Sequence, residues 1–182
     1  MWVGIDTSLT ATGLCLLHED ATGRTRRVFS QGRQTDTHAD TMRRLDRIER
    51  EIRDFFEGVD GVLLGIAMEG PSLSPRRMGQ DHERAGLWWR VFTRASRYAD
   101  VLVVSPKTRA KYATGNGNSG KDEVLLAVSR RYPGVDMVSN DEADAVAIAA
   151  ILARVQGAPV DDPMPKTHLA ALVKLGVPLD AD

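Results

Sequence analysis

Two short apolar runs each end in a carboxylate, and this pattern limits the folds open to the chain. The runs cover residues 1–5 and 62–68, and Asp6 and Glu69 follow them directly. Runs of this length, closed by polar residues and glycine, are typical of strands that are covered on both faces of a sheet. The pattern therefore predicts an α/β core in which Asp6 and Glu69 lie on adjacent central strands.

The remaining segments supply the other elements of such a sheet. Three more strands are expected, at residues 12–17, 26–31 and 101–104. Apolar residues at helical spacing, or helix-capping residues, predict helices at residues 41–56, 82–98, 106–111, 122–132, 141–155 and 166–175. Their order predicts an α/β fold with a mixed five-stranded sheet flanked by helices on both faces.

Length and composition indicate one folded domain. The chain has 182 residues, 42% hydrophobic and 27% charged, and these values exclude collagen-like, disordered and coiled-coil proteins. We expect a domain over residues 1–155, with a linker and a short C-terminal helix in residues 156–182.

Cysteine usage and the absence of targeting signals indicate a cytoplasmic location. The single cysteine, Cys15, excludes an internal disulfide and a four-thiolate zinc site. No signal peptide or membrane span is recognisable. The formal net charge is −1, so a nucleic-acid partner must be argued from the placement of basic residues and not from their total.

Four acids form a candidate metal site. Asp141 and Asp144 are three residues apart at the start of an alanine-rich helix, so they share one helical face, while Glu142 belongs to the helix cap. With Asp6 and Glu69 they offer four carboxylates, which are the hard oxygen ligands that Mg²⁺ and Mn²⁺ prefer. Three of the four acids also have an ordinary alternative, Asp6 as a turn residue and the helix pair as partners of the helix dipole.

The segment 115–121 fits the spacing of a phosphate-binding P-loop, with two glycines and Lys121 correctly placed. Asp122 stands where a Ser or Thr would hold Mg²⁺, and no apolar strand leads into the first glycine. We therefore interpret it as a mobile loop and not as a nucleotide-hydrolysing site.

Four blocks of the sequence, at residues 4–13, 67–70, 105–121 and 141–150, resemble the RuvC family of Holliday junction resolvases, members of the RNase H-like superfamily. The resemblance runs from Met1 to about Leu152. Ribonucleases H usually take their glutamate from the first helix. Here Glu69 closes a strand and two aspartates share the last helix of the domain, which fits the RuvC branch better.

The resemblance implies a crossover junction endodeoxyribonuclease that acts in DNA recombination and repair. Asp6, Glu69, Asp141 and Asp144 match the family's catalytic, metal-binding carboxylates, which implies two Mg²⁺ ions per site, with Mn²⁺ as a substitute. Lys121 matches the lysine that the loop brings to the scissile phosphate, where a cation stabilises transition-state charge.

The same resemblance implies DNA contacts and a symmetric assembly. The residues expected to bind branched DNA are Arg76, Arg77, Arg84, Lys107 and Lys121. Two symmetric cuts in a four-way junction require two sites, which a homodimer supplies. The helix at residues 82–98, with Leu87, Trp88 and Trp89, is the expected interface.

Two other functions are also consistent with the sequence. An aspartate followed by small hydroxyl residues and glycine also resembles the first phosphate motif of the actin and sugar-kinase ATPases, although this chain has room for only one such domain. A catalytically silent DNA-binding relative is the other alternative, and the complete set of four carboxylates argues against it.

Overall fold

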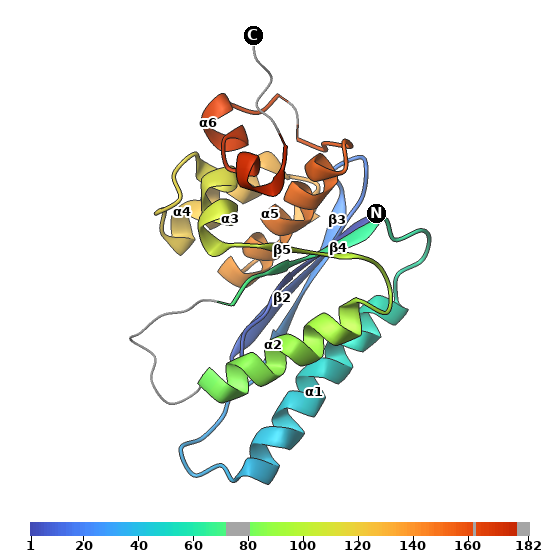
Figure 1. Ribbon diagram of the computed structural model, residues 1–182, viewed down its shortest axis with the longest axis vertical. Coiled ribbons are helices and arrows are strands. Elements are labelled where there is room, and N and C mark those ends of the chain that lie inside the picture. Colours follow the sequence, from blue (N-terminus) through green and yellow to red (C-terminus); the bar gives the residue numbers. More distant parts are fainter. Residues whose placement is uncertain (72–80, 162, 178–182) are drawn as a thin grey trace.

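The computed structural model describes residues 1–71, 81–161 and 163–177, which contain a six-stranded mixed sheet between two layers of helices (Figure 1). The strands are β1 Trp2–Asp6, β2 Ala11–Leu17, β3 Gly23–Phe29, β4 Gly65–Glu69, β5 Val101–Val104 and β6 Val135–Asp136. The helices are α1 His38–Glu57, α2 Asp81–Ala95, α3 Pro106–Thr114, α4 Lys121–Arg131, α5 Asn140–Val155 and α6 Lys166–Leu169, followed by a 3₁₀ turn at Leu172–Leu175. The predicted α/β fold is confirmed.

The sheet topology brings the two predicted carboxylate strands together. The strand order is β5-β4-β1-β2-β3-β6, with β1 parallel to β4 and antiparallel to β2. Ile5 of β1 lies opposite Met68 of β4. The next residues, Asp6 and Glu69, therefore end adjacent central strands at the same end, as the apolar runs predicted.

The helices cover both faces of the sheet. α1 and α2 lie on one face, and α3, α4 and α5 lie on the other (Figure 1). Side chains of β1 alternate between the two layers, so that Trp2 packs in the α5 layer while Val3 and Ile5 pack in the α1–α2 layer. No helix in the described ranges combines the length and the apolar character needed to cross a membrane.

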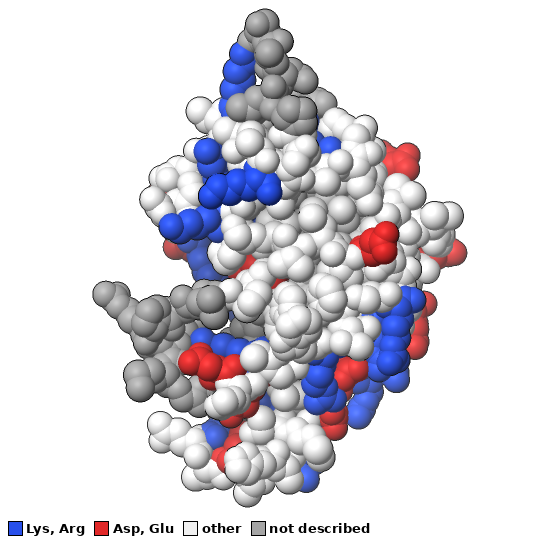
Figure 2. Space-filling view, viewed as in Figure 1, with Lys and Arg blue, Asp and Glu red and all other residues white. Residues whose placement is uncertain are grey.

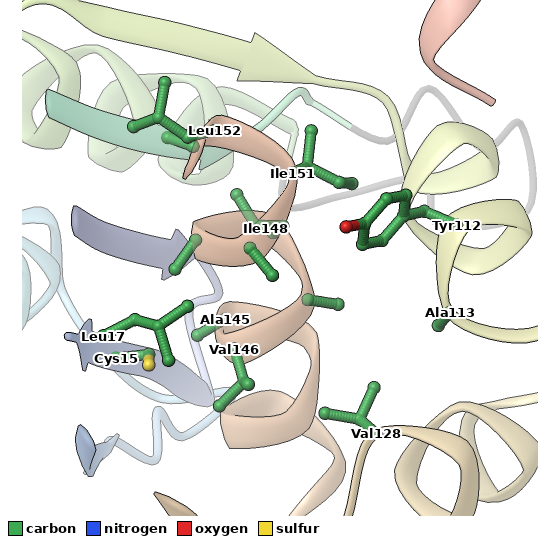
Figure 3. Packing of buried hydrophobic residues seen from close by; sticks show 14 of the residues in the cluster. Cys15, Leu17, Tyr112, Ala113, Val128, Ala145, Val146, Ile148, Ile151 and Leu152 are labelled. Atoms are coloured by element: carbon green, nitrogen blue, oxygen red, sulfur yellow. The ribbon is translucent and has the colours of Figure 1, made fainter. Parts of the chain in front are cut away.

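α5 is the central helix of its layer and is buried on almost every side. Figure 3 shows Ala145 and Ile148 between the strand residues Cys15 and Leu17 and the helix residue Val128. The helix lies very close to the sheet, because a Cβ atom at Gly13 would be 1.9 Å from the carbonyl oxygen of Asp141. The absence of a side chain at Gly13 thus allows the first turn of α5 to rest on β2.

The structure differs from the sequence predictions at some element boundaries. The sheet has six strands where five were predicted, because β6 is a two-residue strand paired with β3 and is too short to show any periodicity. β4 begins at Gly65, three residues later than predicted. α1 begins earlier, at His38, because Thr37 and Asp40 form a capping box.

The segment after α5 packs against the α3–α5 layer. Asp161 is buried and accepts hydrogen bonds from the hydroxyls of Tyr112 (2.7 Å) and Tyr132, and it pairs with Arg154 (2.6 Å). Leu172 joins the same apolar core. The division of the chain near residue 155 stays a prediction.

Candidate metal centre

Asp6 lies where three elements meet. It ends the central strand β1 and is only 7% exposed. Gly13 of β2 is its partner in the sheet, and the backbone of α5 at Asp141 rests on that glycine. β4 ends beside it with Glu69. The topology therefore gathers carboxylates that are far apart in the sequence.

Two hydrogen bonds fix the backbone around Glu69. Its carbonyl oxygen accepts a hydrogen bond from Nε1 of Trp88 in α2 (2.8 Å), and the backbone N–H of Gly70 donates to the carbonyl of Val104 in β5 (2.8 Å). The Glu69 side chain is 14% exposed. Trp88, which we expected at the core and the interface, thus also supports the end of β4.

The cap of α5 positions the two aspartates. The hydroxyl of Ser139 accepts a hydrogen bond from the backbone N–H of Glu142 (3.3 Å), and the carboxylate of Glu142 accepts hydrogen bonds from the Ser139 hydroxyl (2.8 Å) and from the backbone N–H of Val138 (3.1 Å). Glu142 therefore belongs to the cap, as predicted. Asp141 and Asp144 make different contacts, with basic side chains from other elements.

Arg109 is a member of the site that the sequence did not predict. It lies in α3, its side chain is 9% exposed, and its Nε is 3.0 Å from Oε2 of Glu69. Nη1 of the same guanidinium pairs with Oδ2 of Asp144, whose side chain is only 2% exposed. Arg109 thus bridges carboxylates from β4 and α5. Its position in a cluster with Lys107 and Lys111 suggested a solvated surface, and no local signal distinguishes it from those lysines.

Asp141 is held on the more open side of the site. Nε of Arg27 in β3 lies 3.2 Å from its Oδ2, and Nζ of Lys121 lies 3.4 Å from its Oδ1. The side chains of Arg27 and Lys121 are 44% and 60% exposed, so both can be reached from solvent. Lys121 is thus beside the carboxylates, as its predicted role requires, whereas Arg27 was not predicted.

Burial makes the ionised forms of Asp6 and Glu69 costly. Burial raises the pKa of Asp6 to about 6, although the positive charges of Arg109 and Lys121 oppose this rise. Burial, and next the negative charge of Asp6, raise the pKa of Glu69 to about 7, again against Arg109 and Lys121. These mutual effects show that the four groups share one electrostatic environment. The basic side chains present do not fully compensate the carboxylates.

A divalent cation fits the chemistry of this donor set. Oδ1 of Asp144 is buried and has no hydrogen-bond partner in the part of the chain that the structure describes, so one carboxylate oxygen is uncompensated there. Within the described ranges, no three His, Cys, Asp or Glu side chains are grouped so that they could hold a metal ion as they stand. Arg109 gives a physical reason, since it occupies the space between Glu69 and Asp144. The carboxylates suit Mg²⁺ or Mn²⁺ once that space is vacated.

The predicted DNA-binding residues lie on α2, α3 and α4, apart from two that are outside the described part of the chain. Lys107 is exposed on α3, and Arg84 is half-buried on α2, four residues before Trp88. Arg76 and Arg77 lie outside the described residues. The segment between α3 and α4 is a loop and follows a helix, not a strand, which agrees with rejection of a P-loop.

Comparison with known proteins supports the sequence resemblance over part of the chain. No family model matches. A stretch of 51 residues is 41% identical to crossover junction endodeoxyribonuclease RuvC of Rickettsia prowazekii (strain Madrid E), covering 28% of this chain and 32% of that protein. The same enzyme of Rickettsia typhi (strain ATCC VR-144 / Wilmington) is 44% identical over 45 residues, covering 24% and 29%. The matches thus span about a third of these relatives' length.

Solved structures extend the likeness to nearly the whole chain. A structure of Thermus thermophilus RuvC superposes with a TM-score of 0.57 and 20% identity over 96% of each chain. The chain has the RuvC fold. T. thermophilus RuvC in complex with a Holliday junction substrate superposes with a TM-score of 0.60 and 19% identity, over 81% of this chain and 89% of that one. The predicted resemblance to RuvC, and with it the RNase H-like architecture, is confirmed.

Proposed function

We propose that the chain is a metal-dependent endonuclease that cuts branched DNA, with the four-way junction as its substrate. The observation that carries this proposal is the gathering of Asp6, Glu69 and Asp144 at the ends of β1 and β4 and in the first turns of α5, within a RuvC fold. The matched relatives are named as crossover junction endodeoxyribonucleases, and one similar structure holds a Holliday junction.

Asp6, Glu69, Asp141 and Asp144 would hold two Mg²⁺ ions, for which Mn²⁺ can substitute. The bound metal would supply an activated water and offset the negative charge of the phosphodiester. Buried apolar residues of β1 and α5 fix the backbone that carries these carboxylates. Lys121, exposed and next to Asp141, is placed to stabilise charge that develops on the phosphate.

The charge pattern of the surface suggests where DNA binds. In Figure 2, Lys and Arg side chains over α1 and α2 are interspersed with Asp and Glu, and Arg90 and Arg94 pair there with Glu49. Lys and Arg also gather over the α3–α4 side, where Lys107 forms no ion pair with any described residue. Because unpaired cations are available to phosphates, we assign the α3–α4 side and the mouth of the site to the DNA.

A homodimer is part of the proposal, because symmetric cuts need two sites. Of the three residues expected at the interface, Leu87 is buried and Trp88 is half-buried, whereas Trp89 is 61% exposed. Trp89 packs edge-on against Trp88 and Phe92, which gives α2 an aromatic platform. The interface would therefore centre on Trp89. A cytoplasmic location remains part of the same proposal.

The proposal is tested by incubating the protein with labelled four-way junction, linear duplex and RNA–DNA hybrid, each with Mg²⁺ and with chelator. We expect cleavage of the junction with Mg²⁺ and none with chelator. Preferred cleavage of the hybrid would instead indicate a ribonuclease H. Junction binding without cleavage would favour the silent DNA-binding relative, and ATP hydrolysis without DNA cleavage would favour the kinase-like alternative.

A further inference from the structure

Arg109 places a positive charge inside the carboxylate cluster itself. Its guanidinium contacts Glu69 and Asp144, two of the four proposed metal ligands, and it is almost fully buried there. The side chain comes from the first turn of α3, where the backbone N–H of Arg109 donates to the carbonyl of Ser105 (3.0 Å). Arg109 therefore occupies the space that a metal ion at these two carboxylates would need. Its positive charge also offsets the negative charge that would otherwise attract the metal ion.

The pairing of Arg109 is incomplete. Its Nε and Nη1 are buried and close to carboxylate oxygens, yet neither makes a hydrogen bond to any described residue, and Oδ1 of Asp144 has no partner among these residues either. A structural buried ion pair is stabilising only when hydrogen bonds satisfy its remaining polar atoms. A divalent ion carries twice the charge of the guanidinium, binds carboxylate oxygens directly and completes its coordination with water. The two carboxylates are therefore better suited to a divalent ion than to Arg109.

We propose that Arg109 competes with the divalent cation for Glu69 and Asp144, so that a metal ion binds these two carboxylates only as the guanidinium leaves them. This inference rests on the metal site of the proposed function. Beyond that function, it assigns to Arg109 the role of lowering the affinity of the site for metal.

Only the side chain of Arg109 has to move. α3 is fixed by the Ser105 cap, and its residues Ala110, Tyr112 and Ala113 are buried in the core. Asp6 and Asp141 form no ion pair with Arg109 among the contacts of the described residues. Asp141 pairs instead with Arg27 and Lys121, whose side chains are 44% and 60% exposed and can turn away into solvent, so an ion at Asp6 and Asp141 meets weaker competition. Two ions would therefore bind with unequal affinity.

The first test is calorimetric titration of the DNA-free protein with Mn²⁺ at pH 8. In Arg109→Met the apolar stem remains while the charge is lost, and we expect the weaker binding step to tighten at least tenfold. Arg109→Lys keeps a positive charge at this position, and should remain within about threefold of the parent protein because it is this charge that opposes the cation. Lys111→Met, which removes one charge from the same helix without touching the carboxylates, should change the affinity less than twofold.

Equal Mn²⁺ affinity in the parent protein and Arg109→Met, with both folded, would overturn the competition while leaving the metal site intact. Binding of Mn²⁺ by none of the variants would remove the metal site of the proposed function, and the inference with it.

A second test needs no folded variant of Arg109. In protein labelled with ¹⁵N-arginine, the buried Nε–H of Arg109 should give a signal protected from exchange without metal, identified by its loss in Arg109→Lys or by its contact with Glu69. Addition of Mg²⁺ should shift this signal and end its protection. An unchanged, protected signal at Mg²⁺ concentrations that saturate the protein would overturn the proposal.

Discussion

The buried carboxylate of Asp144 needs a positive charge beside it. Its side chain is 2% exposed, one of its oxygens pairs with Arg109, and the other has no hydrogen-bond partner among the residues that the structure describes. An ionised carboxylate in this position is strongly unfavourable unless a cation lies beside it. The ionised carboxylate of Asp144 therefore requires either Arg109 or a metal ion beside it.

The raised pKa values of Asp6 and Glu69 predict how stability depends on pH without metal. A carboxyl group whose pKa is higher in the folded than in the unfolded chain binds its proton more tightly when folded. Ionisation of Asp6 and Glu69, with pKa values of about 6 and 7, therefore destabilises the fold as the pH rises from about 4 to 7. In chelator, Asp6→Asn should reduce the loss of melting temperature between pH 5 and 8 by at least about 3 °C.

Metal binding should oppose this loss of stability at high pH, because a metal ion binds the ionised carboxylates. Mg²⁺ should raise the melting temperature of the parent protein more at pH 8 than at pH 5.5, as measured by differential scanning fluorimetry. Equal stabilisation at both pH values would contradict the assignment of Asp6 and Glu69 as ligands.

Lys121 is expected to act on the reaction and not on the fold. Its side chain is 60% exposed and has one ion pair among the described residues, with Asp141. Lys121→Ala should therefore leave the melting temperature within about 1 °C and slow single-turnover junction cleavage roughly tenfold or more. A rate equal to that of the parent protein would argue against a role for Lys121 at the phosphate.

The sequence was informative about residues with a distinctive local setting. Asp6 and Glu69 each close an apolar run, and Asp141 and Asp144 follow a helix cap, so all four could be chosen without coordinates. Arg109 and Arg27 could not, because their importance arises from tertiary contacts with β4 and α5. The local sequence around each of them predicts a solvent-exposed side chain.

At the scale of elements, the contact between β2 and α5 determines where Asp141 lies. A methyl group at Gly13 would be 1.9 Å from the carbonyl oxygen of Asp141, a distance at which the helix must shift. Gly13→Ala should therefore lower the free energy of unfolding by about 1–3 kcal/mol and weaken Mn²⁺ binding, as measured by denaturant titration and calorimetry.

Gly86→Ala is the matched control for this substitution. It lies in α2, and a Cβ atom there meets no atom of the described residues within 4 Å. Alanine should stabilise the helix there by up to about 1 kcal/mol. If both variants had the same effect, the close approach of α5 to β2 would not be what positions the first turn of α5.

Elements were predictable where a periodic pattern was long enough. The amphipathic α1 and the apolar runs of β1 and β4 were found from spacing alone, with boundaries off by a few residues. β6 was missed because two residues carry no period, and its pairing with β3 depends on where α4 ends. The close approach of α5 to β2 could not be predicted from the sequence either. A glycine in a strand does not indicate which backbone segment packs against it.

At the scale of the whole molecule, the account predicts a dimer that depends on α2. Trp89 is 61% exposed in an aromatic platform, so Trp89→Glu should give monomers in sedimentation velocity at concentrations where the parent protein is dimeric. Leu126→Glu on α4, where the leucine is 51% exposed, should leave the dimer intact. A parent protein that is monomeric at all concentrations would contradict the symmetric assembly.

We propose that the carboxylates around Asp6 bind the metal ion with which the protein cleaves branched DNA. The most direct measurement compares the parent protein with Asp6→Asn for cleavage of a labelled four-way junction in Mg²⁺ and for binding of the same junction in Ca²⁺ or chelator. We expect cleavage to fall at least about a hundredfold while junction affinity changes less than about threefold, because the substitution removes a metal ligand and leaves the basic surface unchanged. Cleavage by Asp6→Asn at the parent rate would contradict it.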